Sequence, residues 1–231
     1  MLKGKCVLVG ITGGIAAYKI CELIRMYKKN GAEVKVICTP NAMNFVTKLT
    51  LQNLSQNEVY VQEFDVKEWK PEHISLADEA DIMVIAPATA NTISKFAYKI
   101  SDNPVNTLLI TAQGHDTPIV FVPSMHDSMY DAVSENVEKL KEEGIKFVNP
   151  RIDEGKAKFP AIEDIVLESV RAVNLDRVSK GIAGGVVSNI AGKNILISLG
   201  GTFEEIDPIR GISNRSSGRM GLELAKEAFV R

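Results

Sequence analysis

The sequence predicts an α/β fold, a doubly wound parallel sheet of the Rossmann-like or flavodoxin-like kind with helices on both faces. Short apolar runs alternate along the chain with segments whose apolar residues recur at helical spacing. The runs are apolar at nearly every position, which is typical of parallel strands buried on both faces. Small, polar or turn-forming residues follow each run, so we expect the chain to turn into a helix after each strand.

The first expected strand is KCVLVGIT (5–12), which a two-glycine turn connects to a helix. The apolar residues of segment 15–31 recur at helical spacing, and Gly31 is suited to end that helix. The next strand is EVKVICT (33–39). The short segment EVYVQEF (58–64) is either a third strand or an excursion from the sheet.

The alternation continues through the middle of the chain. The expected elements there are the strand IMVIAPA (82–88), a helix from Thr89 to about Ile100, the strand PIVFVPS (118–124), a helix from about Ser128 to Glu143, the strand IKFVNP (145–150) and a closing helix over IEDIVLESVRAV (162–173).

We expect three parts along the chain: a first domain over 1–175, a linker over 176–193 and the opening of a second α/β domain over 194–231. The linker is rich in Gly and Ser. After it, NILISLGGT (194–202) is expected to form a strand and MGLELAKEAFVR (220–231) a helix. One strand and one helix cannot bury a parallel-sheet core, so the second domain is expected to be incomplete in this chain.

The composition suits a soluble globular protein: the chain has 231 residues, 45% of them hydrophobic, and a formal net charge of −2. No apolar run reaches the length of a membrane span, and no signal-peptide core precedes the first strand. The charges are dispersed, which favours neither nucleic acid nor a membrane surface as a partner. Cys6, Cys21 and Cys38 are odd in number and lack metal-ligand spacing, so we expect reduced core thiols, no bound metal and a cytoplasmic protein.

The ends of the strands locate the expected site, because ligands of doubly wound sheets bind beyond the carboxyl ends of the strands. Small and polar residues follow four strands, and we expect them to line one crevice. They are Thr12-Gly13-Gly14, Thr39-Pro40-Asn41, Pro87 to Thr92 and Pro123 to His126. The short side chains of APATANT (86–92) would allow a flat ligand to lie against them.

GITGGIAAYK (10–19) places two glycines between a strand and a helix. Unobstructed backbone amides at a helix N-terminus suit a phosphate, but the same glycines also suit a tight turn. The spacing matches neither the dinucleotide fingerprint nor the P-loop, so the motif alone leaves both interpretations open. Thr39, at the end of the neighbouring strand, favours the phosphate.

The chain contains three histidines, and each has its own interpretation. His73 precedes the 82–88 strand and is either a capping or solvated residue or a general base, since its segment leads into the crevice. His126 is either an ordinary turn residue or an anion-binding or acid/base group at a strand end. His115 is expected to be an ordinary loop residue.

The segment DEGKAKF (153–159) is either a solvated surface loop or a lid whose lysines face an anionic substrate. Three residues that follow the 118–124 strand have two interpretations: they contact a ligand, or they are core residues, which their helical spacing explains equally well. They are Met125, Met129 and Tyr130.

Several of these stretches together resemble one family, the cysteine-decarboxylase flavoproteins. They are GITGGIAAYK, the His-containing HISLADEADIMVIAPATANTISK, SDNPVNTLL and the P-x-M-x-x-x-M pattern of PSMHDSM. The chain is similar in particular to the bifunctional phosphopantothenoylcysteine decarboxylase/phosphopantothenate–cysteine ligases of coenzyme A biosynthesis, in an archaeal-like variety. The resemblance covers essentially the whole chain, because GGTFEEIDPIRGISNRSSGRMG (200–221) resembles the opening of the ligase domain.

The resemblance implies that the flat ligand is flavin mononucleotide (FMN). Its phosphate would lie near the glycine turn, and its ring and ribityl chain would lie against the short side chains after the 82–88 strand. The implied cofactor-binding residues are Gly13, Gly14, Ile15, Thr39, Thr89, Ala90, Asn91, Thr92 and Ser124. The implied substrate-binding residues are Asn91, Met125, His126 and Met129. The family also implies a homotrimer or a dodecamer.

The implied reaction is the FMN-dependent decarboxylation of (R)-4′-phosphopantothenoylcysteine to 4′-phosphopantetheine, the work of a carboxy-lyase. Oxidation of the cysteine thiol by the flavin gives a thioaldehyde, which accepts the electrons left behind by carbon dioxide. The resulting enethiolate takes back two electrons from the reduced flavin. His73 matches the essential base of the family.

Two positions depart from the family pattern. The family has Asn after P-x-M, where it holds the substrate carboxylate, and this chain has His126, whose protonated ring could do the same work.

The family's lid carries a Cys that protonates the enethiolate, and no Cys follows Cys38. Our hypothesis is that Lys156 or Lys158 replaces it; an unchanged ratio of reduced to unreduced product in both lysine variants would contradict this. With neither lysine active, the reaction would stop at the enethiol, as in related peptidyl-cysteine decarboxylases.

The family's ligase domain uses CTP with Mg²⁺ to activate phosphopantothenate, and Asn214 falls in the ISNRSSG motif used near that intermediate. The rest of the nucleotide site would lie beyond Arg231, so we expect no ligase turnover from this chain alone. CTP-dependent amide formation by this chain would contradict that expectation.

Two alternatives to the decarboxylase stay open: a flavin prenyltransferase-like enzyme and a non-catalytic flavin-binding regulatory subunit. His73 and the P-x-M-x-x-x-M pattern favour the decarboxylase.

Overall fold

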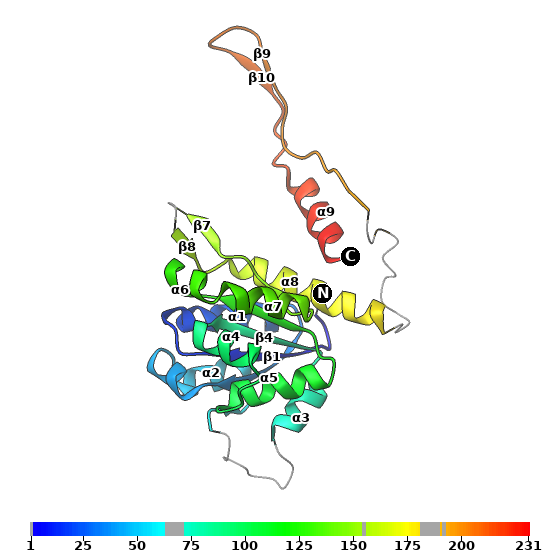
Figure 1. The fold of residues 1–231 in the computed structure, drawn as a ribbon. Helices are drawn as coiled ribbons and strands as arrows, with labels where there is room; N and C mark the ends of the chain where they lie inside the picture. Colours follow the sequence, from blue (N-terminus) through cyan, green and yellow to red (C-terminus); the bar gives the residue numbers. More distant parts are fainter. Residues whose placement is uncertain (1, 63–71, 154–155, 181–189, 191–192) are drawn as a thin grey trace. The chain divides into compact units, whose positions relative to one another are not determined.

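The fold was determined as a computed structural model in which the chain divides into two units, Met1–Val173 and Asn174–Arg231 (Figure 1). Each unit is described separately below. The structure describes every residue except 1, 63–71, 154–155, 181–189 and 191–192. For a few further residues only the secondary structure is described, namely 72–75, 151–153, 156–158 and 177–179.

The first unit is built on a six-stranded sheet in which every recorded strand pair is parallel. The strands lie in the order β3-β2-β1-β4-β5-β6, with β1 and β4 at the centre. Their bounds are β1 Cys6–Ile11, β2 Glu33–Cys38, β3 Val59–Tyr60, β4 Ile82–Ala88, β5 Ile119–Pro123 and β6 Lys146–Phe147. The doubly wound parallel sheet is therefore confirmed, and the segment with two open interpretations contributes the edge strand β3.

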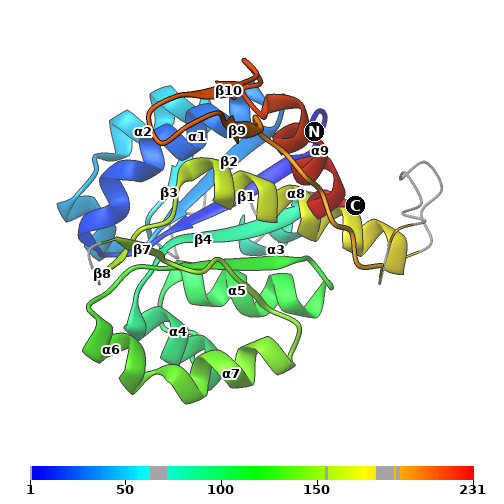
Figure 2. The ribbon, with the colours of Figure 1, turned by 90° about the horizontal axis from the view of Figure 1, so that it is seen from above.

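Helices cover both faces of this sheet. Figure 2 shows α1, α2 and α8 on one face and α3, α4, α5 and α7 on the other. The helices are η1 Ile15–Lys19, α1 Ile20–Lys29, η2 Pro40–Asn44, α2 Lys48–Ser55, α3 Glu72–Glu79, α4 Ala90–Ala97, α5 Pro104–Gly114, α6 Asp127–Ala132, α7 Ser134–Glu142 and α8 Ile162–Ser179. The last of these, α8, continues beyond residue 173, where the sequence pattern predicted its end, and it crosses the boundary between the two units.

The helix expected from about Ser128 to Glu143 is two helices, α6 and α7, that meet at Val133. The side chain of Val133 is buried, and the hydroxyl of Ser134 donates to the backbone oxygen of Asp131 at 2.7 Å. A hydroxyl that bonds the backbone locally offers an alternative to the helical ladder, which explains the break.

The segment predicted as a loop or lid (153–159) overlaps a short antiparallel hairpin, β7 Arg151–Asp153 and β8 Lys156–Lys158. It lies between β6 and α8 in the chain. Pro150 precedes the hairpin, and the buried Phe159 follows it.

The core of the first unit is continuous across the α3–α4–α5–α7 face of the sheet. The rings of Phe96, Phe121 and Phe147 stack in sequence, with centroids 5.7 Å and 5.3 Å apart. Apolar burial of this extent holds the strands in register and fixes where their carboxyl ends lie.

The second unit contains a hairpin, β9 Phe203–Glu205 with β10 Gly211–Ser213, and the helix α9 Arg219–Val230. The predicted C-terminal helix is confirmed. The predicted strand over 194–202 is wrong, because residues 193–199 have no regular secondary structure and no described strand pairs with them. A strand is stable only as part of a ladder, so an apolar run without a partner does not form one.

None of the helices in the described ranges is long and apolar enough to cross a membrane.

The buried hydroxyl of Tyr27 in α1 is 2.7 Å from the hydroxyl of Ser169 in α8, and Ser169 also donates to the backbone oxygen of Ile165. Both side chains are fully buried, and burial raises the pKa of Tyr27 well above its usual value. The phenol therefore stays neutral and depends on Ser169 as its partner.

We predict that Ser169→Ala lowers the free energy of unfolding by about 1–3 kcal/mol, because it leaves the Tyr27 hydroxyl buried without a partner. Adding Tyr27→Phe to this variant removes the orphaned group, so the double variant should lose less than the sum of the single losses. Urea denaturation of the four proteins measures this coupling, and strictly additive losses would contradict it.

Candidate functional site at the carboxyl edge of the sheet

The ends of β1 and β4 are joined through the side chain of Thr12. Its hydroxyl donates to the backbone oxygen of Pro87 at 2.6 Å and accepts from the backbone N–H of Thr89 at 3.2 Å. Thr12 is almost fully buried, so both bonds are shielded from water. The loop after β1 and the loop after β4 are thereby held side by side.

Gly13 lies against the loop that follows β2. A Cβ atom at Gly13 would be 2.6 Å from the Cβ and 3.1 Å from the backbone carbonyl carbon of Asn41. Real Cβ contacts essentially never come so close, so the position requires glycine for this approach. A Cβ atom at Gly14 would meet Thr89 and Pro87 at 3.5 Å and 3.6 Å, which is ordinary contact.

Polar groups without partners gather at this turn. The hydroxyl oxygen of Thr39, at the end of β2, is buried and has no hydrogen-bond partner in the structure. In the described part of the chain, no acceptor is recorded for the backbone N–H groups of Gly13 and Ile15. Buried polar groups are nearly always bonded, so an orphaned hydroxyl beside free N–H groups indicates room for an anionic ligand.

The loop after β4 presents short side chains at the same edge. Thr89 caps α4, and its hydroxyl is 3.2 Å from that of Thr92, whose side chain is buried. Ala90 is half-buried and Asn91 is exposed. With no large side chain in this run, it can contact a flat molecule along its length.

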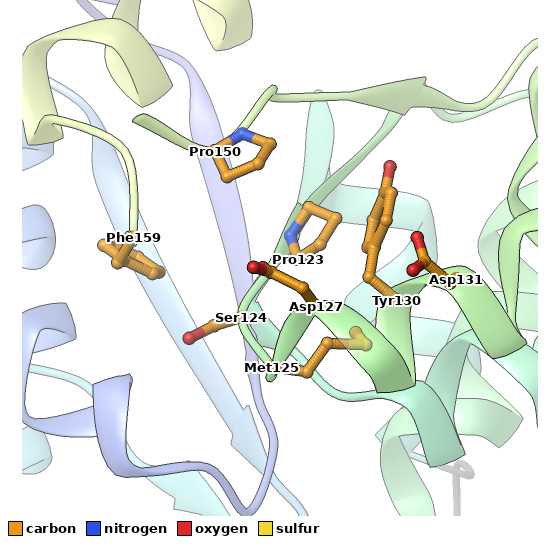
Figure 3. Close-up of a pocket in the computed structure, with 8 residues that line it drawn as sticks. All are labelled: Pro123, Ser124, Met125, Asp127, Tyr130, Asp131, Pro150 and Phe159. Carbon is orange, nitrogen blue, oxygen red and sulfur yellow. The ribbon is translucent and has the colours of Figure 1, made fainter. Parts of the chain in front are cut away.

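At the end of β5, the backbone N–H of Ser124 donates to the backbone oxygen of Ala88 at 3.1 Å and so brings the next loop to the same edge. A pocket of about 140 Å³ begins there, and Figure 3 shows its lining residues. They are Pro123, Ser124, Met125, Asp127, Tyr130, Asp131, Pro150 and Phe159.

His126 caps the N-terminus of α6 and is exposed. Its Nδ1 atom is 3.4 Å from the backbone N–H of Ser128, which donates to it, and 3.0 Å from the Ser128 hydroxyl. In the neutral ring an accepting Nδ1 places the proton on Nε2, which leaves a donor free for a ligand.

All three cysteines are free thiols. Cys6 and Cys38 are buried, and burial raises their pKa to about 11 and about 12, so both thiols are protonated and unreactive at neutral pH. Cys21 is half-buried. Within the described ranges, no cluster of three or more His, Cys, Asp or Glu side chains could hold a metal ion.

The structure brings most of the predicted cofactor residues to one edge of the first unit, through the loops after β1, β2, β4 and β5. Within this set, Ile15 has 71% of its surface exposed. Of the predicted substrate residues, Met125 is half-buried and lines the pocket, whereas Met129 is half exposed. Asn214 lies in the second unit, where its side chain accepts from the backbone N–H of Ser216 at 3.0 Å.

Three of the predicted catalytic residues fall outside the described side chains. His73 lies in α3, and Lys156 and Lys158 lie in β8, but only their secondary structure is described. The roles assigned to them stay predictions. His115, interpreted as an ordinary loop residue, follows α5, and its Nδ1 atom lies 2.9 Å from a carboxylate oxygen of Asp78 in α3.

Sequence reasoning missed several residues of the pocket at the end of β5. Asp127 and Asp131 were assigned no role. Tyr130 was left open between a ligand contact and a core residue, and it both packs against the core and lines the pocket. Phe159 comes from a segment far along the chain. The available signal was the i, i+4 spacing of the two aspartates on a helix that begins at a strand end.

Two family models match the chain. Residues 1–174 match the family described as Flavoprotein, and residues 190–231 match the DNA/pantothenate metabolism flavoprotein C-terminal domain.

Curated relatives are similar over the whole chain. It is 40% identical over 236 residues to the coenzyme A biosynthesis bifunctional protein CoaBC of Thermococcus kodakarensis, covering 100% of this chain and 54% of that protein. It is 38% identical over 239 residues to the protein of the same name from Bacillus subtilis, covering 99% of this chain and 55% of that one. The chain thus spans about half the length of the curated relatives it matches.

Solved structures share the fold of the first unit. The FMN binding protein AtHal3 is 26% identical, with a TM-score of 0.60, and the match covers 71% of this chain and 93% of that one. A PPC decarboxylase variant is 25% identical, with a TM-score of 0.59, and the match covers 77% of this chain and 98% of that one.

We predict that Gly13→Ala destabilises the first unit by about 1–3 kcal/mol, because the added methyl group would displace the backbone of Asn41. Gly14→Ala is the matched control, since its methyl group would make ordinary contacts and its φ of −136° suits any residue. Thermal unfolding of both variants measures the difference. Equal melting temperatures for the two variants would contradict the close approach at Gly13.

Proposed function

The chain belongs to the flavoprotein family, and we propose that it is the FMN-dependent decarboxylase part of a coenzyme A biosynthesis protein. Its substrate would be (R)-4′-phosphopantothenoylcysteine, and its products 4′-phosphopantetheine and carbon dioxide. The names of the curated relatives and of the two solved structures support this assignment. Because the chain spans about half of those relatives, the activity of the whole protein is part of the proposal.

One observation carries the cofactor assignment: the buried, unpartnered hydroxyl of Thr39 beside the glycine turn. A phosphate there would accept from the Thr39 hydroxyl and from the free N–H groups of Gly13 and Ile15, which together satisfy three of its oxygen sites. The absence of side chains at Gly13 and Gly14 leaves the backbone accessible. The residues present therefore fit the phosphate end of FMN.

The flat end of the cofactor fits the loop after β4. Thr89, Ala90, Asn91 and Thr92 offer short side chains with hydroxyl and amide groups, and Ser124 comes from the neighbouring loop. When bound, FMN would supply two-electron chemistry by accepting an electron pair from the substrate thiol and returning it after carbon dioxide has left.

The remaining steps fall to the side chains of this chain. We assign His73 as the base that removes a proton from the substrate. His126 would hold the substrate carboxylate through its free Nε2–H, and a charged ring would strengthen that bond. Lys156 or Lys158 would return a proton to the enethiolate. Met125 and Met129 would contact the substrate from the loop after β5 and from α6.

Further parts of the proposal concern the rest of the molecule. We propose residues 1–175 as the decarboxylase domain, 176–193 as a linker and 194–231 as the opening of a ligase domain that uses CTP and Mg²⁺, with Asn214 near its intermediate. The match of residues 190–231 to a pantothenate-metabolism domain supports this division. A cytoplasmic location and a homotrimer or dodecamer complete the proposal, and the free thiols favour that location.

A flavin prenyltransferase-like enzyme and a non-catalytic flavin-binding subunit would share the same cofactor site. The decarboxylase is favoured by the matches of both parts of the chain, because residues 190–231 match a pantothenate-metabolism domain and the curated relatives are named for coenzyme A biosynthesis.

We predict that Thr39→Val weakens FMN binding about tenfold or more without destabilising the free protein. Valine has nearly the same shape and removes an orphaned hydroxyl whose burial is costly, while the phosphate loses one charge-assisted hydrogen bond. Quenching of FMN fluorescence during titration measures the affinity, and thermal unfolding measures the stability. Thr12→Val is the contrasting control, because it breaks two native bonds and should destabilise the free protein. Unchanged FMN affinity in Thr39→Val would contradict the phosphate assignment.

We also predict that His73→Asn lowers the rate of carbon dioxide release from phosphopantothenoylcysteine by about a hundredfold or more and leaves FMN binding intact, as expected when a general base is lost. Gas release and the absorption spectrum of the bound flavin measure the two effects. Asparagine keeps hydrogen-bonding groups of similar size. A parent protein that binds FMN and releases no carbon dioxide would favour the regulatory subunit instead.

A further inference from the structure

The pocket of about 140 Å³ at the end of β5 has no part in the cofactor contacts above, apart from Ser124 at its edge. It lies between α6 and the two residues that flank the β7–β8 hairpin, Pro150 and Phe159. In Figure 3 the Ser124 hydroxyl points to the side of the pocket on which Phe159 lies, and Tyr130 and Asp131 lie on the opposite side. None of the residues of the glycine turn lines the pocket, which belongs to the end of β5.

The walls of the pocket are largely apolar, and three polar side chains on α6 face it. In the part of the chain that the structure describes, no hydrogen bond or ion pair is recorded for the phenol of Tyr130 or for the carboxylates of Asp127 and Asp131. Asp127 and Asp131 are exposed residues and so belong to the mouth of the pocket, whereas Tyr130 is half-buried. Carboxylates only accept hydrogen bonds, so the pocket suits a ligand that brings donors and apolar atoms together.

The size of the pocket limits the ligand. A cavity of about 150 Å³ admits a molecule of about six heavy atoms. That is too small for a flavin ring and large enough for a short segment of an acyl chain. The two carboxylates would repel a phosphate, which has to remain outside.

The spacing of the two aspartates adds a geometrical constraint. Side chains at i and i+4 of a helix have Cβ atoms about 5–6 Å apart on the same face. In the substrate of the proposed decarboxylase, the β-alanyl unit separates two amide nitrogens by four bonds, or about 5 Å when extended. In an ordinary peptide, consecutive amide nitrogens are three bonds apart, at about 3.5 Å.

We propose that this pocket binds the β-alanyl amide arm of the substrate, with Asp127 and Asp131 accepting from its two amide N–H groups and Tyr130 packing against its methylene carbons. The inference rests on the proposed function and deepens it. Asp127, Tyr130 and Asp131 are then specificity-determining residues that select acyl-cysteines with a β-amino acid spacer over peptidyl-cysteines. The phosphate end of the substrate leaves through the mouth of the pocket.

The test measures binding to the FMN-loaded protein by calorimetry. The probes are 4′-phosphopantetheine, which has no carboxylate to lose, and its homologue with a glycyl unit in place of the β-alanyl unit. The variants are Asp127→Ala and Asp131→Ala, because alanine removes the acceptor and keeps the helix. The control is Glu142→Ala, an exposed residue of α7 with the same loss of charge.

The parent should bind 4′-phosphopantetheine about tenfold more tightly than the glycyl homologue, from the difference of one charge-assisted hydrogen bond. Asp131→Ala should weaken the binding of 4′-phosphopantetheine about tenfold and the binding of the homologue less than twofold. Glu142→Ala should change neither affinity. The KM for phosphopantothenoylcysteine should rise by a similar factor in Asp131→Ala, with little change in kcat.

Three outcomes would overturn the inference: no binding of 4′-phosphopantetheine to the parent, equal losses for both probes in Asp131→Ala, or binding of Mg²⁺ alone that depends on Asp131 and displaces the probe. Selective, Asp131-dependent binding in a parent that releases no carbon dioxide would support the pocket and contradict the proposed function. If the parent releases carbon dioxide and neither aspartate variant changes its KM or kcat, the result would support the proposed function and contradict the role of the pocket.

Discussion

The hydroxyl group of Thr12 is the contact on which the rest of the edge depends. It bonds the backbone of Pro87 and of Thr89, and so holds the ends of the two central strands in one fixed arrangement. With this arrangement fixed, Gly13 can approach Asn41 closely, and the loop after β4 can present its short side chains beside the glycine turn. A parallel sheet with both faces covered leaves its carboxyl edge as the natural place for such a site.

The same edge keeps features that do not favour stability. The buried hydroxyl of Thr39 has no partner, and the glycine at position 13 gives up the conformational restriction that a side chain would provide. Departures from local stability rules are expected where a ligand completes the structure. Pairing the Thr39 hydroxyl with a phosphate would account for the first departure, and the close approach of Gly13 to Asn41 accounts for the second.

Much of the fold could be predicted from the sequence, because continuous apolar runs such as 82–88 and the two-glycine turn are local signals of parallel strands and tight connections. The strand predicted over 194–202 was wrong since its formation depends on a partner that hydropathy does not report. The pocket could not be predicted, because Asp131 and Phe159 come to line one cavity only in the folded chain. The lack of a partner for the Thr39 hydroxyl could not be predicted from the sequence either, although the position of Thr39 at a strand end favoured a phosphate there.

The most direct test of the central claim compares the affinities of riboflavin and of FMN for the purified chain, because the two molecules differ only in the phosphate. If main-chain N–H groups and the Thr39 hydroxyl hold that phosphate, FMN should bind about a hundredfold more tightly or better, as at least two charge-assisted hydrogen bonds would give. Equal affinities, or no binding of either molecule, would contradict the account.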